Sequence, residues 1–281
     1  MKKIKIITDS SSGISQEEGK RLQIGVVPMP IVVDGKEYLD GIDMFYEDAV
    51  TFLQEKKVFK TAQPLVKEML TIWEEALEEY ETVLYIPLSS GLSGSCANAY
   101  TLSKEYEGRV VVVDAKAVES PLRYVCLEAK KMVDKGMSAL EIKETLEADF
   151  RSTYACIVPE TVEPLKRGGR ITPAVAAVAG LLKIQPILKI EYGNVDLHSK
   201  VRTLKKAYKE AMEQVKNSAP EHEVNWLFLS IGFTKEEEQE LLNMFKEVIG
   251  REDVFADHFT PIIAAHTGNR TVGIGYTKKY N

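Results

Sequence analysis

Short β-branched runs alternate with longer amphipathic segments along the first half of the chain. Between residues 65 and 80, apolar residues recur with a period of about 3.6 residues, which predicts a helix that begins just after Pro64. Short apolar runs predict a strand at 4–8 and buried strands at 83–87 and 109–114. Because strands that alternate with helices favour right-handed βαβ units, we expect a largely parallel sheet.

Capping and turn residues locate further elements in this half. Ser15-Gln16-Glu17-Glu18 fits a capping box at the start of a short helix. Asp34-Gly35 follows the apolar run 26–33 and is typical of a hairpin turn. Further helices are expected at 45–56, 95–107, 122–135 and 138–150.

The second half of the chain again mixes strands and helices. Gly193-Asn194 predicts a hairpin turn between two of its strands. The two adjacent helices at 122–150 form a natural end to the first domain, so we expect two α/β domains, residues 1–150 and 151–281. The pattern predicts strands at 154–158, 184–192, 195–201, 226–231 and 271–276, and helices at 203–217 and 235–249.

Composition narrows the class of protein. The chain has 281 residues, of which 44% are hydrophobic and 28% charged, as in globular proteins. Its net charge of −6 speaks against a general nucleic-acid-binding surface. The longest mostly apolar stretch, Ala174–Leu182, is far shorter than the ~20 residues of a spanning helix, so no transmembrane segment is expected. Three cysteines without a C-x-x-C motif predict a reduced, cytoplasmic protein with neither disulfides nor a zinc site.

Two loops rich in hydroxyl groups follow predicted strands. Thr8-Asp9-Ser10-Ser11-Ser12-Gly13 lies at the carboxyl end of the first strand, the edge at which open α/β sheets bind ligands. The same residue types are also common in ordinary turns. The loop Ser89–Ser95 stands before a helix, where free N–H groups and the helix dipole attract anions. Gly91 and Gly94 allow its backbone to approach a ligand closely.

Three further motifs are weaker on their own. Thr61-Ala62-Gln63-Pro64 is ordinary capping chemistry at a helix start. Within Leu165–Ile171, Gly168-Gly169 fits a helix C-terminus, and Arg170 can bind a carboxylate or phosphate, although a surface ion pair is its more usual role. His266-Thr267-Gly268 is a possible partner for Arg170, but a single histidine is more often structural.

An enzymatic function is an alternative interpretation of the serine loop. Gly91-Leu92-Ser93-Gly94-Ser95 is close to the nucleophile elbow G-x-S-x-G, but Ser95 stands where the last glycine belongs. A lipid hydrolase or acyltransferase would use Ser93 as nucleophile, His266 as base and Asp9 or Asp114 to orient the base. The motifs G-x-x-x-x-G-K-[ST], H-E-x-x-H and G-x-G-x-x-G are absent from the sequence.

Six motifs occur in a fixed order along the chain. They are Ile7-Thr8-Asp9-Ser10-Ser11, Thr61-x-Gln63-Pro64, Ser90-Gly91-Leu92-Ser93-Gly94-Ser95, Leu165-x-x-Gly168-Gly169-Arg170-Ile171, Pro186-Ile187-Leu188 and His266-Thr267-Gly268. Together they resemble the DegV family, the fatty-acid-binding subunits of bacterial fatty-acid kinase. The resemblance covers nearly the whole chain and implies two α/β domains with a lipid tunnel between them.

The resemblance also implies which residues bind the ligand. In the family, a Thr and a Ser hold the fatty-acid carboxylate, with an Arg and a His nearby. The residues that match these four here are Thr61, Ser93, Arg170 and His266. To them we add the neighbouring Gly94, Ser95 and Thr267 as ligand-binding residues, and we expect Asp9, Ser10 and Glu119 to support the pocket.

A separate kinase subunit in this family phosphorylates the bound carboxylate with ATP and magnesium, which makes an acyl phosphate for phospholipid metabolism. The resemblance therefore implies a lipid-binding protein rather than an enzyme, with no cofactor and no metal of its own. The expected partners of this protein are a long-chain fatty acid and the kinase subunit. The resemblance is also compatible with transient contact between the protein and a membrane surface during lipid exchange.

Two segments depart from the family pattern. Where the family commonly has D-S-x-x-x-S-x-G-x-G, Glu119 replaces a serine, while Pro121 and Arg123 replace glycines. A buried Glu119 would repel a carboxylate or need Arg123 as a partner, because an unpaired buried charge is costly. Arg270 stands at the last glycine of the common H-T-G-P-G motif. These changes leave open a different amphipathic small molecule as the ligand.

Overall fold

Strands and helices alternate as predicted in the computed structural model, which describes residues 2–149, 153–178, 184–220 and 223–280. The chain forms two units, Met1–Phe45 with Lys60–Phe150 and Tyr46–Phe59 with Arg151–Asn281. The continuous division into residues 1–150 and 151–281 therefore differs from the structure in one segment. Residues 46–59 belong to the second unit, because apolar side chains of this segment pack against its core.

The first unit is built on a four-stranded sheet, with the strands in the order β2-β1-β6-β7. Every neighbouring pair is parallel, which confirms the predicted sheet type. Its strands are β1 (Lys2–Asp9), β2 (Gly25–Val27), β6 (Tyr80–Ile86) and β7 (Val110–Val112).

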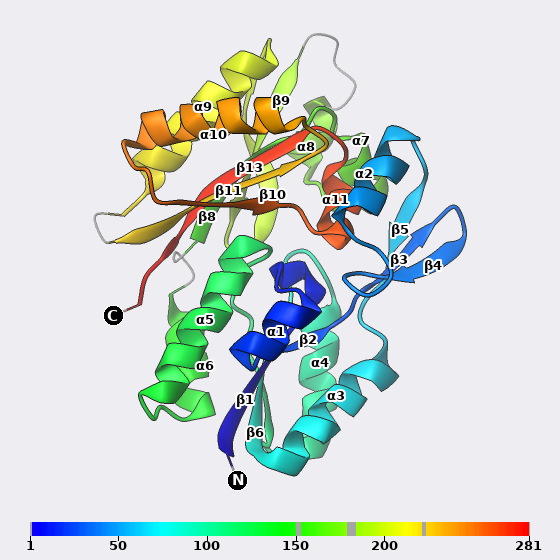
Figure 1. The fold of residues 1–281 in the computed structure, drawn as a ribbon, viewed down its shortest axis with the longest axis vertical. Helices are drawn as coiled ribbons and strands as arrows, with labels where there is room; N and C mark the ends of the chain where they lie inside the picture. Colours follow the sequence, from blue (N-terminus) through cyan, green and yellow to red (C-terminus); the bar gives the residue numbers. More distant parts are fainter. Residues whose placement is uncertain (1, 150–152, 179–183, 221–222, 281) are drawn as a thin grey trace. The chain divides into compact units, whose positions relative to one another are not determined.

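Helices cover both faces of this sheet (Figure 1). On one face, α3 and α4 bury Met69, Trp73 and Cys96 against β6 and its neighbours, as the helical period of the sequence predicts. The opposite face packs against α5 and α6, and α1 packs beside β2. These helices are α1 (Gln16–Leu22), α3 (Val66–Glu79), α4 (Ser95–Ser103), α5 (Ser120–Asp134) and α6 (Ala139–Ala148).

A small three-stranded sheet, in the order β4-β3-β5, is formed by strands that lie between β2 and β6 in the sequence. Its strands are β3 (Pro30–Val33), β4 (Lys36–Leu39) and β5 (Phe59–Thr61). Asp34 and Gly35 join β3 to β4 with φ angles of 49° and 87°, the conformation of the predicted hairpin turn. Sequence reasoning missed β5, since three residues are too few to show an alternating pattern.

The second unit is built on a six-stranded, mostly antiparallel sheet in the order β10-β9-β8-β13-β11-β12. The pair β11 and β12 is parallel. Strand β12 was not predicted, because its last three residues are exposed and hide any apolar alternation. The strands are β8 (Thr153–Val158), β9 (Gln185–Glu191), β10 (Asn194–Val201), β11 (Val224–Ile231), β12 (Val254–His258) and β13 (Thr271–Lys278).

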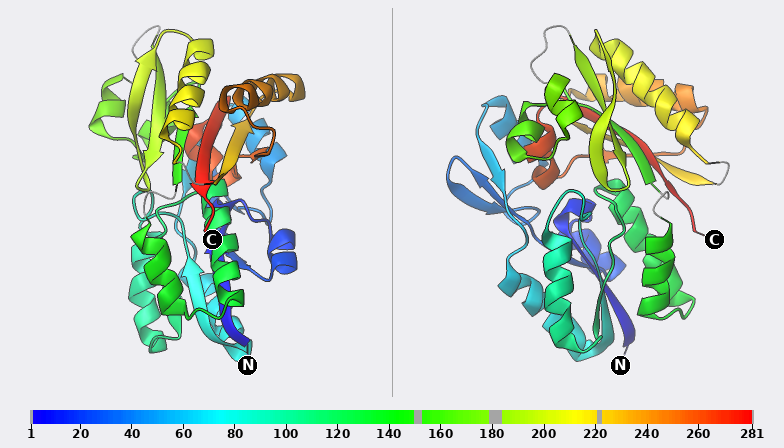
Figure 2. Two further views of the ribbon diagram at one scale, coloured as in Figure 1. Left: turned by 90° about the vertical axis from the view of Figure 1, so that its left-hand side faces the viewer. Right: turned by 180° about the vertical axis from the view of Figure 1, so that it is seen from behind.

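The predicted helices α9 (Leu204–Ser218) and α10 (Lys235–Ile249) lie side by side on this sheet (Figure 2). They share a core with Phe228 of β11, whereas Leu229 and Ile231 of the same strand pack with Tyr46 and Ala264. Because successive side chains of a strand point to opposite faces, the second group marks the other face of the sheet. Tyr46 and Ala264, the partners of β11 on that face, belong to α2 (Tyr46–Gln54) and α11 (Pro261–Thr267).

Two short helices complete the second unit, α7 (Glu163–Gly168) and α8 (Pro173–Val178), and α7 packs against α11. Part of the apolar stretch Ala174–Leu182 forms α8, while residues 179–182 lie outside the described residues. Within the described ranges, no helix has the length and apolar character needed to cross a membrane.

Candidate functional site

The loop that follows β1 is organised by Asp9, which is fully buried. Its carboxylate accepts hydrogen bonds from Ser11 N at 3.1 Å, Ser11 Oγ at 2.5 Å and Leu88 N at 2.8 Å. Burial raises the pKa of Asp9, although these hydrogen bonds favour the charged form. Asp9 thus ties the loop after β1 to the loop after β6, which is a supporting role.

Ser10 and Glu119 extend the same polar network. Ser10 Oγ accepts a hydrogen bond from Met29 N at 3.2 Å, and Glu119 N donates to Ser11 O at 2.7 Å. Glu119 is buried at the start of α5 and has a φ of 58°, a left-handed conformation that favours glycine. The structure therefore brings Asp9, Ser10 and Glu119 together at the carboxyl edge of the parallel sheet.

The serine loop precedes α4 and carries the candidate carboxylate donors. Ser93 Oγ accepts a hydrogen bond from Ser95 N at 3.2 Å, which turns the chain into the helix. Ser95 is buried, and its Oγ has no hydrogen-bond partner within the described part of the chain. A Cβ atom on Gly94 would lie 2.8 Å from Gln63 Nε2, so the Thr61–Pro64 segment lies against this loop. Thr61 and Ser93 thus belong to one region of the first unit.

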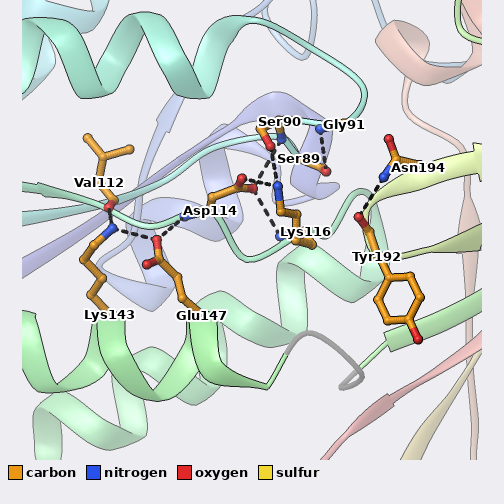
Figure 3. Close-up of polar contacts among 10 residues, drawn as sticks. All are labelled: Ser89, Ser90, Gly91, Val112, Asp114, Lys116, Lys143, Glu147, Tyr192 and Asn194. Carbon is orange, nitrogen blue, oxygen red and sulfur yellow. Dashed lines mark hydrogen bonds and ion pairs between the residues drawn. The ribbon is translucent and has the colours of Figure 1, made fainter.

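Side chains from the loop after β7 support the serine loop (Figure 3). Lys116 Nζ lies 2.6 Å from Asp114 Oδ2 and donates to Ser90 Oγ at 2.5 Å. Asp114 Oδ1 accepts from Ser90 N at 3.2 Å. Burial would raise the pKa of Asp114, yet the hydrogen bonds from Lys116 and Ser90 hold it below its ordinary value. Sequence reasoning missed Lys116, whose side chain reaches Ser90 across 26 residues of chain.

Arg123 forms its clearest contacts with α1. Its guanidinium donates to both carboxylate oxygens of Glu18, from Nη2 to Oε1 at 2.5 Å and from Nη1 to Oε2. The hydrogen bond from Arg123 lowers the pKa of Glu18. This bidentate pair joins α5 to α1. From the sequence, Arg123 was considered as a partner for a buried Glu119, so its pairing with Glu18 was not expected.

In the second unit, the structure brings together the two motifs that were considered as partners. Helix α7 ends at Gly168, and Gly169 caps it with a φ of 72°, as the paired glycines predict. A Cβ atom on Gly168 would lie 2.9 Å from His266 Cε1 and closer still to Nδ1. Burial, and then the charge of Arg170, lower the pKa of His266 to about 4. Arg170 itself is exposed and donates to the carbonyl of Gly168.

The residues after His266 are also well defined. Thr267 is buried, and its Oγ1 lacks a hydrogen-bond partner among the residues that the structure describes. Arg270 has a φ of 51° and donates to Glu237 Oε1 at 2.8 Å and Oε2 at 3.2 Å, while its guanidinium lies 4.7 Å from the centre of the Phe233 ring. Arg270 therefore connects the start of β13 to α10, at the position where the resemblance implies a glycine.

The expected site residues thus form two clusters, each within one unit. The first-unit cluster has hydroxyls and backbone N–H groups, and the second-unit cluster has a guanidinium and an imidazole. Among the described side chains, no group of three or more His, Cys, Asp or Glu could hold a metal ion. The members are Asp9, Ser10, Thr61, Ser93, Gly94, Ser95 and Glu119 in the first unit, and Arg170, His266 and Thr267 in the second.

Comparison with known proteins agrees with the resemblance. The model of the DegV family, described as an uncharacterised protein family, matches residues 3–279. A DegV domain-containing protein of Staphylococcus aureus is 30% identical, with 98% of this chain and 97% of the relative covered. Two solved structures are similar over 99–100% of this chain and 100% of theirs. They are a fatty-acid-binding DegV family protein from Thermus thermophilus (28% identity, TM-score 0.88) and one from Streptococcus agalactiae (26%, 0.89).

Proposed function

This chain belongs to the DegV family, and we propose that it binds a long-chain fatty acid and presents its carboxylate to a separate ATP-dependent kinase subunit. The main observation in support of fatty-acid binding is the similarity of this chain, over its whole length, to two solved structures described as fatty-acid-binding. In this proposal the kinase makes an acyl phosphate for phospholipid metabolism, and this chain acts as the lipid carrier rather than as the catalyst. A cytoplasmic location fits its three free, buried cysteines.

The first-unit cluster supports a carboxylate ligand. Ser93 Oγ already accepts a hydrogen bond from Ser95 N, so its own proton is available to donate to an anion. A hydroxyl that donates to a carboxylate makes a charge-assisted bond, which is stronger than a neutral one. Thr61 adds a second hydroxyl in the neighbouring segment. Thr61 ends β5 and Ser93 lies two residues before α4, and two hydroxyl donors in neighbouring segments suit a single negatively charged head group.

The two candidate ligand-binding side chains of the second-unit cluster, His266 and Arg170, differ in charge at pH 7. With a pKa of about 4, His266 is neutral at pH 7 and carries one N–H donor and one acceptor nitrogen. The cation that offsets a carboxylate in this cluster is therefore Arg170 rather than His266. We propose that each cluster contributes to retention of the fatty acid, and the expected lipid tunnel stays a prediction.

The alkyl tail supplies most of the binding free energy in this proposal. Burial of about fifteen methylenes at ~0.8 kcal/mol each gives ~12 kcal/mol before costs. Loss of motion in the tail and in the protein subtracts a substantial part of that sum. The remainder still supports tight retention, so we expect the fatty acid to survive purification of the protein.

Denaturing extraction of purified protein, followed by lipid mass spectrometry, tests the proposal. We expect about one fatty acid per chain, and lower retention in Ser93→Ala and in Arg170→Ala than in Glu79→Gln, an exposed control. The double variant then shows whether the two residues act on the same carboxylate, because coupled residues give non-additive losses. No lipid, even after incubation with oleate and palmitate, would refute the fatty-acid proposal and favour another amphipathic ligand.

Two further measurements separate the alternatives. Phosphorylation of the bound fatty acid after addition of the kinase subunit and ATP would support the carrier role, and binding without phosphorylation would remove it. A fluorophosphonate probe that labels Ser93 would instead favour the hydrolase or acyltransferase, because only an activated serine reacts with it.

A further inference from the structure

Helix α2 comes from the first third of the sequence, yet its apolar side packs within the second unit. Tyr46, Val50 and Leu53 pack against a cluster of buried side chains from β11, from the residue after β12 and from α11, namely Leu229, Ile231, Phe259 and Ala264. Helix α2 also contacts α11 directly. Helix α11 carries His266 in its last turn, so α2 packs on the helix that presents one of the candidate ligand-binding residues.

The first residue of α2 is held by a specific aromatic contact. The ring of Tyr46 stacks on the imidazole of His258, with ring centroids 3.9 Å apart and an angle of 17° between the rings. Glu238 fixes the imidazole from its edge, since Oε1 lies 3.2 Å from His258 Nε2 and also accepts from Ser230 Oγ at 2.5 Å. A hydrogen bond from the backbone of Gly232 reaches the Tyr46 hydroxyl. These contacts define one position for the start of α2.

The other end of α2 leads directly to Thr61. The helix ends at Gln54, Lys57 N then donates to Phe52 O at 3.0 Å, and β5 begins at Phe59. This hydrogen bond holds residues 55–58, which connect the two elements, against the end of α2, so the connection between α2 and β5 is short. Thr61 is the last residue of β5, and Ala62 N next to it donates to Pro30 O at 3.1 Å.

We propose that α2 is a positioning element for the ligand site, that the stack of Tyr46 on His258 is its anchoring contact, and that it acts on the ligand through Thr61. A shift of α2 on α11 is transmitted along the short connection to the Thr61 hydroxyl. Tyr46 and His258 are positioning residues that do not themselves touch the ligand. The inference rests on the proposed function for its effect on binding.

Equilibrium binding of cis-parinaric acid, a fluorescent long-chain fatty acid, tests the proposal in the full chain. We expect Tyr46→Ala and His258→Ala to weaken binding by about tenfold, a loss of ~1.4 kcal/mol. Tyr46→Phe keeps the stacking ring and should bind within about twofold of the unmodified protein. In a Thr61→Ala background the Tyr46→Ala effect should largely disappear, whereas in an Arg170→Ala background it should persist.

A matched core variant separates positioning from general destabilisation. Val215→Ala removes buried volume from α9 in the same unit and should lower the free energy of unfolding without changing the affinity for parinaric acid. Equal loss of affinity in Val215→Ala and Tyr46→Ala would overturn the proposal. So would additive effects of Tyr46→Ala and Thr61→Ala.

Hydrogen exchange tests the same connection without a ligand. Tyr46→Ala should speed exchange of the Ala62 amide, and Val215→Ala should not. If the unmodified protein binds no fatty acid, the proposed function fails, and this measurement alone decides the coupling. An Ala62 amide that exchanges equally in Tyr46→Ala and the unmodified protein would refute the coupling whatever the ligand is.

Discussion

The backbone of Gly168 lies directly against the imidazole of His266, because any Cβ atom at residue 168 would come within 2.9 Å of His266 Cε1. Helix α7 therefore needs a glycine where it meets α11, and the contact sets where the imidazole can lie. The two motifs that carry Gly168 and His266 are separated by nearly a hundred residues in the sequence, yet they form one cluster in the second unit.

Substitution of Gly168 should displace His266. We expect Gly168→Ala to lower the free energy of unfolding by ~1–3 kcal/mol, the usual cost of forcing an extra group into a packed site, and to lower fatty-acid retention as well. Gly169→Asn is the control, because a Cβ atom there meets nothing within 4 Å and asparagine tolerates the left-handed φ of 72°. Urea unfolding and lipid mass spectrometry measure the two effects, and a Gly168→Ala protein as stable as Gly169→Asn would contradict the prediction.

The pH dependence of stability should report the burial of His266. Its pKa is lowered from 6.5 in the unfolded chain to about 4 in the folded protein, so the unfolded state binds a proton first as the pH falls. Stability from this group is complete above pH 6.5 and should fall by about 3 kcal/mol as the pH drops to 4. Urea unfolding at pH 7 and pH 4 measures this loss.

His266→Gln removes the titrating group and should make stability less sensitive to pH over the same interval. The comparison is made within each protein between the two pH values, so any constant cost of the substitution cancels. Equal losses in His266→Gln and the unmodified protein would show that other groups dominate the acid sensitivity.

Loss of the Asp9 charge should loosen the loops at the carboxyl edge of the parallel sheet. Asp9→Asn turns one acceptor oxygen into an NH₂ group that faces N–H or O–H donors, so at least one buried donor loses its partner. We expect a loss of ~2–3 kcal/mol, within the range for an unsatisfied buried group bonded to a charge. Thermal or urea unfolding measures it, and the exposed Glu79→Gln should change stability by less than about 0.5 kcal/mol.

Arg270 combines backbone strain with a surface ion pair, and two substitutions separate them. Arg270→Ala loses the Glu237 and Phe233 contacts but keeps a side chain at a φ of 51°, so we expect a loss of about 1 kcal/mol. Arg270→Gly loses the same contacts but also removes the strain, worth ~1 kcal/mol, and should be nearly neutral. Urea unfolding of the pair checks the order of stability, and Arg270→Ala as stable as Arg270→Gly would show that φ is not strained.

Sequence reasoning predicted the long elements because each carries a complete local pattern. The helix at Val66–Glu79 has a continuous apolar face, the Asp34-Gly35 turn has residues that adopt positive φ, and α1 has its N-cap at Ser15, whose side chain accepts a hydrogen bond from Glu18 N. Strands β5 and β12 escaped notice because one is three residues long and the other has exposed ends. Short elements depend on neighbouring strands for their hydrogen bonds, which no local pattern records.

The sequence by itself determined the alternating α/β architecture, the parallel sheet type and the six motifs that identify the family. Local periodicity and turn-forming residues act over a few residues, so they can be recognised from the sequence without a structure. Only the tertiary structure decided that Arg123 forms an ion pair with Glu18, that Lys116 donates a hydrogen bond to Ser90, and that residues 46–59 pack with the second unit. Those outcomes depend on which side chains meet after the chain has folded, and burial and charge pairing between distant residues leave no periodic trace in the sequence.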